Sequence, residues 1–120
     1  MGTFRKVAGV EEIPPGEAKA VFFEGEDVGL FNVNGAYYAV DNLCPHAGGA
    51  LNLGTVEGTR VTCPWHAWVF DLRDGRCVAA AGIAPEKISP SWSLCSYQVR
   101  VEGRDILMAR RGEREGKPVP

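Results

Sequence analysis

Two short stretches, Cys44-Pro45-His46 and Cys63-Pro64-Trp65-His66, are the only places in this 120-residue chain where cysteine and histidine meet. Together they use both of its histidines, and sixteen residues, from 47 to 62, separate them. Two thiolates and two imidazoles form a metal-ligand set. They suit an iron–sulfur centre in which one iron has cysteine ligands and its partner iron has histidine ligands.

A structural zinc ion is the alternative, because two cysteines and two histidines also bind zinc. Zinc fingers usually pair like ligands, with two cysteines on a hairpin and two histidines on a helix. Here each stretch mixes the two residue types. Pro45, Pro64 and Gly48-Gly49 also favour tight loops over a helix. The pattern therefore favours an iron–sulfur cluster.

The surrounding sequence resembles the soluble ferredoxins of the Rieske [2Fe–2S] family, from about residue 4 to about residue 110. The resemblance is carried by residues 39–42, 48–51 and 65–72, which read AVDN, GGAL and WHAWVFDL. It implies one [2Fe–2S] cluster per chain, in which Cys44 and Cys63 bind one iron and His46 and His66 bind the other. A Rieske-like fold that has lost its cluster is a further alternative.

Respiratory-chain and photosynthetic Rieske proteins carry an extra disulfide between the two cluster loops. The resemblance places those cysteines at Gly49 and Trp65, so this bridge cannot form here. Cys77 and Cys95 lie away from ligand spacing, and we interpret them as buried thiols. A disulfide or redox pair is the alternative for these two residues.

The pattern along the chain predicts an all-β fold. Short alternating segments at 3–7, 18–23, 29–33 and 37–40 read as strands, and Asn34-Gly35 is a type I′ hairpin signal. Later hairpins are expected about residues 57–58, 73–75 and 102–105, with a helical turn near 11–12 or 85–88. The resemblance implies an antiparallel β-sandwich or barrel with a small inserted cluster-binding lobe. We expect one domain over 1–110, the lobe at about 42–81, and a disordered tail at 111–120.

Several residues near the two stretches have structural interpretations. Trp65 and Trp68 are expected to pack the lobe and exclude water from the cluster. Asp41 and Asp71 are expected to act at turns and strand ends. By the resemblance, a proline-bearing loop covers the cluster, and Pro85 or Pro90 is the candidate for it.

Composition excludes some classes of function. Fifteen acidic and thirteen basic residues give a formal charge of −2, with no basic stripe, so we expect no nucleic-acid partner. No apolar run approaches the roughly 20 residues that a membrane helix needs, and no signal peptide is visible. We therefore expect a cytoplasmic protein with no membrane association.

The sequence contains no Gly-rich dinucleotide fingerprint, no nucleophile with a base, and no second histidine pair for a catalytic iron. We expect an electron carrier with no catalytic activity of its own. The resemblance implies transient partners: an NAD(P)H-dependent flavoprotein reductase and a terminal oxygenase. The alternatives are a small subunit of an NAD(P)H nitrite reductase and a redox-sensing domain.

Overall fold

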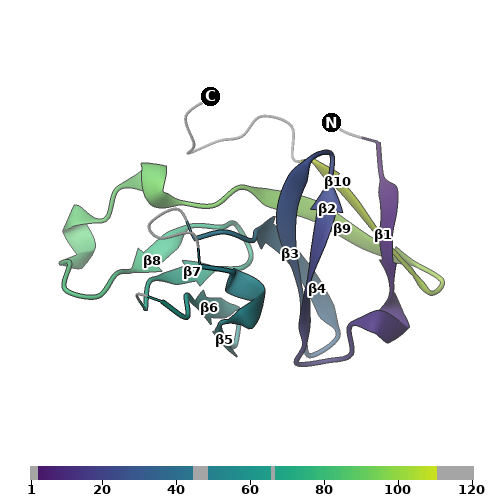
Figure 1. The fold of residues 1–120 in the computed structure, drawn as a ribbon, viewed down its shortest axis with the longest axis horizontal. Coiled ribbons are helices and arrows are strands. Elements are labelled where there is room, and N and C mark those ends of the chain that lie inside the picture. Colours follow the sequence, from purple (N-terminus) through teal and green to yellow (C-terminus); the bar gives the residue numbers. More distant parts are fainter. Residues whose placement is uncertain (1–2, 45–48, 66, 111–120) are drawn as a thin grey trace.

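The computed structural model describes residues 3–44, 49–65 and 67–110. In these ranges the chain forms ten strands and four short 3-10 helices, and all strand pairs are antiparallel (Figure 1). This confirms the all-β prediction. None of the helices in the described ranges is long and apolar enough to span a bilayer.

A six-stranded sheet, which we call the base, joins the first and last parts of the chain. Its order is β1-β10-β9-β4-β3-β2, and its two edge strands β1 and β2 approach one another, so that the sheet curls toward a barrel. Its strands are β1 (Arg5–Gly9), β2 (Ala18–Phe23), β3 (Glu26–Val33), β4 (Ala36–Asp41), β9 (Ser96–Glu102) and β10 (Asp105–Arg110).

Tight turns set the register of the base. The β3–β4 hairpin turns at Asn34-Gly35, whose φ angles of 54° and 94° are both positive, as a type I′ turn requires. The Asn32 side chain supports this turn by accepting a hydrogen bond from the Gly35 amide at 2.7 Å. The predicted hairpin is therefore confirmed. A second such turn, at Glu24-Gly25, joins β2 to β3.

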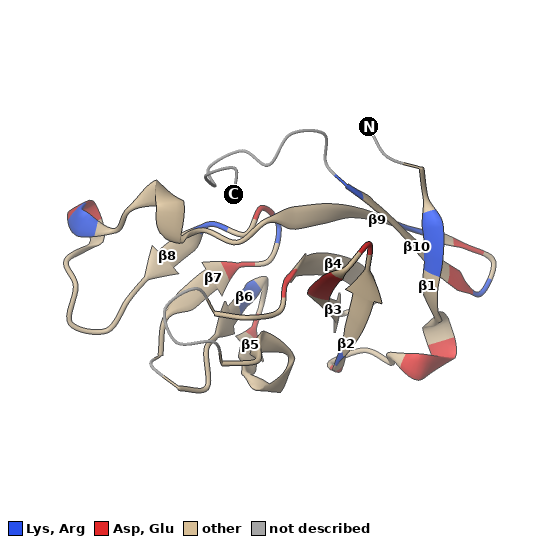
Figure 2. Cartoon of the chain, turned by 45° about the horizontal axis from the view of Figure 1, so that its top comes forward, with Lys and Arg blue, Asp and Glu red and all other residues tan. Residues whose placement is uncertain are grey.

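A four-stranded sheet, which we call the lobe sheet, is inserted between β4 and β9. It follows a 3-10 helix, η2 (Leu51–Leu53), and its charged residues lie near its turns (Figure 2). Its strands are β5 (Thr55–Glu57), β6 (Arg60–Thr62), β7 (Val69–Asp71) and β8 (Cys77–Ala79). Two 3-10 helices, η3 (Pro85–Lys87) and η4 (Pro90–Trp92), then lead the chain back to the base.

The buried apolar side chains form two clusters. Val28, Leu30, Ile106 and Met108 are fully buried in the base, whereas Leu51, Val61, Phe70 and Leu72 belong to a second cluster in the lobe. Burial of a side chain of this size contributes about 1.5–3 kcal/mol. The lobe cluster also includes Phe31 of β3 and Val40 of β4, so it joins the lobe to the base.

Strand ends differ from the predictions by a few residues. The first strand is β1 at Arg5–Gly9 rather than 3–7, and β3 begins at Glu26 rather than 29. Glu26 and Asp27 have low intrinsic preference for strands, and their pairing with β2 overrides that preference. The expected helical turns are present as η1 (Val10–Glu12) and η3. The tail 111–120 lies outside the described residues.

Candidate metal centre

The two cysteine-containing loops begin in the same way. The Cys44 amide donates to the Gly49 carbonyl at 2.9 Å, and the Cys63 amide donates to the Trp68 carbonyl at 2.7 Å. In both cases the acceptor is five residues further along the chain. The residues that flank each loop pair in antiparallel fashion: Leu43 pairs with Ala50 across the first loop, and Thr62 pairs with Val69 across the second. Each cysteine therefore sits at the first position of a loop held by a hairpin.

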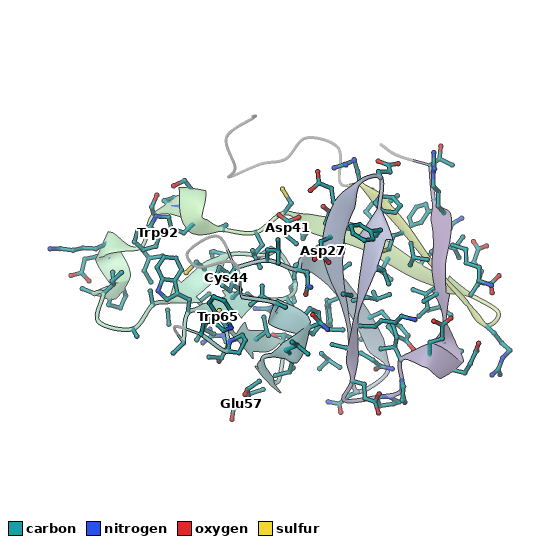
Figure 3. All side chains as sticks on the ribbon, viewed as in Figure 1. Asp27, Asp41, Cys44, Glu57, Trp65 and Trp92 are labelled. Carbon is teal, nitrogen blue, oxygen red and sulfur yellow. The ribbon has the colours of Figure 1, made fainter. Side chains whose placement is uncertain are left out.

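The two loops lie against one another. A Cβ atom added to Gly49 would be 3.1 Å from Cys63 Sγ and 3.1 Å from Trp65 Cγ, and Gly49 is buried. A side chain at this position would require the sulfur or the indole to shift by a few tenths of an ångström, so glycine suits this close approach. Figure 3 shows Cys44 and Trp65 close together on the lobe. Positions 49 and 65 thus face each other, where the resemblance places the missing disulfide.

Both cysteines have the properties that a cluster needs. Cys44 and Cys63 are each 2% exposed, and neither forms a disulfide bond. A buried thiolate is costly unless a metal or another positive charge neutralises it, and the close approach of Gly49 brings the first loop against Cys63 Sγ. These observations fit an iron–sulfur group. The other two predicted ligands, His46 and His66, lie outside the described residues.

The tryptophans divide into two kinds. Trp68 is 7% exposed and belongs to the lobe core, as predicted, but Trp65 is 65% exposed. The prediction that Trp65 packs the lobe is wrong, because its ring lies on the Gly49 backbone at the surface. Trp92, whose role no sequence pattern indicated, stacks on Trp68 with ring centroids 4.9 Å apart. This contact fixes η4 to the lobe.

The proline-bearing segment therefore has a defined anchor. Pro85 and Pro90 begin η3 and η4, where the missing amide of proline costs nothing. Ile88 and Trp92 pack on the lobe core. The coverage of a cluster by Pro85 or Pro90 stays a prediction.

Buried polar groups hold the chain where it enters the lobe. Asp41 accepts hydrogen bonds from the Cys95 amide and from the Tyr97 hydroxyl, both at 2.9 Å. The next residue, Asn42, accepts from the Asn52 amide and donates to the Asn52 side chain, also at 2.9 Å each. Asp41 ends β4 as predicted. Asn42 anchors the segment that follows the first loop, a role that its sequence context did not reveal.

Asp71 ends β7 and is fully buried. Its carboxylate accepts hydrogen bonds from the backbone amide of Arg73 at 2.9 Å, from Arg73 Nε at 3.0 Å and from Arg73 Nη2 at 2.7 Å. The guanidinium contact lowers the pKa of Asp71. The predicted strand-end role is confirmed.

Cys77 and Cys95 form no disulfide bond and are buried, at 5% and 6% exposure. They belong to different cores, Cys77 to the lobe and Cys95 to the base. Burial raises the pKa of the Cys77 thiol, which keeps it protonated. The interpretation as buried thiols is confirmed.

Comparisons with known proteins agree with the geometry. The family model for the Rieske [2Fe-2S] domain matches residues 3–101. The biphenyl dioxygenase ferredoxin subunit of Pseudomonas sp. (strain KKS102) is 35% identical over 107 residues, which cover 88% of this chain and 91% of that protein. The ferredoxin component of a naphthalene 1,2-dioxygenase system from Pseudomonas aeruginosa is 33% identical over 97 residues, or 81% and 86% of the two chains.

Solved structures are similar over most of the chain. The ferredoxin of carbazole 1,9a-dioxygenase from Nocardioides aromaticivorans IC177 has a TM-score of 0.76 and 29% identity, covering 91% of this chain and 99% of that one. A protein described as an NADH-dependent nitrite reductase small subunit, from Mycobacterium tuberculosis, has a TM-score of 0.77 and 25% identity. That match covers 94% of this chain and 99% of the other.

Proposed function

Because the chain belongs to the Rieske [2Fe–2S] domain family, we propose that it is a one-electron carrier between an NAD(P)H-dependent flavoprotein reductase and a terminal oxygenase. The observation that carries this proposal is the pair of matching loops, with Gly49 of one loop seated on Cys63 of the other. The lobe thus brings two buried thiols to adjoining loops at the end of a small domain. Such a site suits a centre that exchanges electrons at the protein surface.

The proposed ligands are Cys44 and Cys63 for one iron and His46 and His66 for the other. When bound, the cluster would accept and release one electron. The chain's own contribution is to hold the loops and exclude water. The loop-closing hydrogen bonds fix the two cysteines, and the Trp68–Trp92 stack adds apolar cover next to the second loop. We further propose one domain over 1–110 with the lobe at 42–81, and a cytoplasmic location.

The carrier function is supported by the similarity of this chain to ferredoxin components over most of their length. It covers 91% of the biphenyl dioxygenase ferredoxin subunit and 86% of the naphthalene dioxygenase ferredoxin component. Both are described as ferredoxin parts of dioxygenase systems. By analogy with them, we expect this chain to have no catalytic activity of its own.

The structural similarity to a nitrite reductase small subunit supports a second candidate function. In that function the chain would be a fixed component of an NAD(P)H-dependent enzyme. Its interface would then be permanent rather than transient, and permanent interfaces are larger and more apolar.

The first test is the composition of the centre. The purified chain should contain about two irons and two acid-labile sulfides and, when reduced, give the low average g-value of histidine ligation. Cys44→Ser, Cys63→Ser, His46→Ala and His66→Ala should each abolish or degrade that signal. Cys77→Ser and Cys95→Ser are the matched controls, because both thiols are buried but neither belongs to the two loops: Cys77 lies on β8 and Cys95 in the core of the base. Zinc without labile sulfide would contradict the proposal.

The second test distinguishes the two functions. As a carrier, the chain should be reduced by NADH through a flavoprotein reductase of a dioxygenase system, and it should purify alone. As a nitrite reductase subunit, it should purify from its native cell in a stoichiometric complex that withstands high salt.

A further inference from the structure

The first loop, which begins at Cys44, rests on less sheet structure than the second. The second loop is flanked by Thr62 and Val69, which belong to the strands β6 and β7 of the lobe sheet. The first loop is flanked by Leu43 and Ala50, which form an isolated bridge outside the named strands. The position of the first loop therefore depends more on the contacts made by the residues at its two ends.

Asn42 lies just before this loop and is 1% exposed. Its backbone amide donates to the Asp27 carbonyl of β3 at 2.9 Å, and its carbonyl accepts from the Leu51 amide of η2 at 2.7 Å. Its side chain repeats this connection. The Nδ2 atom donates to Asp27 Oδ1 at 3.3 Å and to Asn52 Oδ1 at 2.9 Å, and the Oδ1 atom accepts from the Asn52 amide at 2.9 Å. Every polar atom of Asn42 is therefore hydrogen-bonded, either to the base or to η2.

The base provides space for this side chain because residue 29 is a glycine. Gly29 is buried in β3, and a Cβ atom on it would be 2.8 Å from Asn42 Oδ1. That separation is too short for a real Cβ contact, so a side chain at position 29 would displace a neighbour such as the Asn42 amide group. In Figure 3, Asp27 lies where the base meets the lobe, and Cys44 lies further out on the lobe.

Resting on the proposed cluster-bearing function, we propose that Asn42 is a positioning residue, which sets where the first loop lies relative to the second. Both ends of the first loop lead to this one side chain, because residue 42 precedes the loop and residues 51 and 52 follow it. The loops approach closely, since a Cβ on Gly49 would be 3.1 Å from Cys63 Sγ. A shift at the ends of the first loop would therefore change the distance between Cys44 and Cys63. Loss of a residue that orients metal ligands typically lowers metal affinity about 10- to 100-fold.

The test changes a hydrogen-bond donor into an acceptor without changing the size of the side chain. In Asn42→Asp, an oxygen replaces Nδ2 and faces the Oδ1 atoms of Asp27 and Asn52, so both donated hydrogen bonds are lost. We expect the purified iron–sulfur protein to lose iron to an excess of chelator at least about tenfold faster than wild type. The g-values of the reduced centre should also shift, because they report the geometry of its ligands.

A second variant restores the pair in the opposite direction. Asp27→Asn combined with Asn42→Asp again places one donor and one acceptor at these two positions, and the Asn52 amide group can rotate to donate to the new carboxylate. This double variant should recover the wild-type g-values and a rate of iron loss within about threefold of wild type. Asn52→Ala is a milder change at a half-buried residue, and it should shift the g-values in the same direction as Asn42→Asp.

Asn32→Asp is the matched control. Asn32 is also buried, at 4% exposure, and lies near the end of β3, whereas Asp27 lies near its start. Its side chain donates to the Ile13 carbonyl at 2.8 Å and accepts from the Gly35 amide at 2.7 Å. The control variant should lower the resistance of the chain to denaturant and leave the g-values unchanged. Wild-type g-values in Asn42→Asp or Asn52→Ala, equal shifts in Asn32→Asp, or no recovery in the double variant would overturn the proposal.

These measurements are independent of the redox partners. The g-values and the rate of iron loss depend only on the centre and its loops. A chain that no dioxygenase-type reductase reduces can still show the predicted shift and its recovery, in which case the carrier function fails and the role of Asn42 stands. A chain that the reductase reduces readily, with wild-type g-values in every variant, gives the opposite result.

Discussion

The indole ring of Trp65 lies over the backbone of Gly49, so close that a Cβ on Gly49 would be 3.1 Å from Trp65 Cγ. The same Cβ would be 3.1 Å from Cys63 Sγ. Gly49 therefore joins the first loop to the second, because it contacts both the exposed Trp65 and the proposed iron ligand Cys63.

We expect Gly49→Ala to destabilise the centre, by about 1–3 kcal/mol, because an iron-bound sulfur cannot move away from the added methyl group. Iron content per chain and the temperature at which the visible absorption is lost measure the effect. Gly9→Ala is the control. Its Cβ would meet only the carboxylate end of Glu11, an exposed and flexible side chain. Equal losses in the two variants would show that the Gly49 contact has no special role.

Ala67 has a φ of 58°, in the left-handed region that non-glycine residues rarely adopt. We expect Ala67→Gly to stabilise the chain by up to about 1 kcal/mol, since relief of the Cβ clash exceeds the entropic cost of glycine. The rate of absorption loss in guanidinium chloride should fall accordingly. Ala50→Gly should have the opposite effect, because Ala50 has an ordinary extended φ of −77°. A faster loss in Ala67→Gly would contradict this prediction.

Asp71 contributes stability that depends on pH. Its pKa is lowered in the folded protein by the Arg73 guanidinium, so the contribution is complete above the ordinary pKa of aspartate, near 4, and is lost as pH falls through the lowered value. We expect Asp71→Asn to cost about 1–3 kcal/mol at pH 7, because the buried acceptor of three hydrogen bonds loses its charge.

The difference between wild type and Asp71→Asn should shrink as the pH is lowered below 4. Denaturant unfolding of both proteins from pH 7 to pH 3 measures it. Asp74→Asn serves as control, because Asp74 is exposed and accepts a single bond from the Arg76 amide. A difference that is constant with pH would show that the Asp71 charge is unimportant.

Trp92 fastens the segment with η3 and η4 to the lobe through its stack on Trp68. We expect Trp92→Ala to release this segment and to cost about 3 kcal/mol or somewhat less, because Trp92 is only partly buried. Proteolysis should then cleave between residues 84 and 93 several times faster than in the wild type. Unchanged cleavage would mean that Ile88 alone holds the segment.

Local signals predicted most of the fold. The β3–β4 hairpin was predicted from Asn34-Gly35, because both residues tolerate positive φ. The strand β2 was predicted at its observed bounds. The start of β3 was missed because Glu26 and Asp27 pair with β2 against their own preference.

The site was predictable only where chemistry fixes the residue type. Cys44 and Cys63 were found from ligand spacing, and both lie buried on adjoining loops. Composition and periodicity did not predict the exposure of Trp65 or the stack of Trp92 on Trp68. Both features depend on contacts between segments that are far apart in the sequence.

The last prediction concerns the reduction potential. Hydrogen bonds donated to cluster sulfur stabilise the reduced state and raise the potential. Respiratory Rieske proteins carry hydroxyl groups just after the stretch that matches Cys63-Pro64-Trp65-His66, whereas this chain has Ala67, Trp68 and Val69 there. The loop-closing bonds also occupy the Cys44 and Cys63 amides, which donate to backbone carbonyls at 2.9 and 2.7 Å.

With these donors absent or engaged, we expect a midpoint near the lower end of the Rieske range, about −150 mV, which flavins fed by NAD(P)H can reach. Protein-film voltammetry at pH 7 measures it. Gly49→Ala provides an internal comparison, because it disturbs the contact with Cys63 Sγ without adding a donor, and should not raise the potential. A wild-type midpoint well above zero would reveal a donor to cluster sulfur from elsewhere in the chain. Such a potential would be too high for the proposed place between a flavoprotein reductase and an oxygenase.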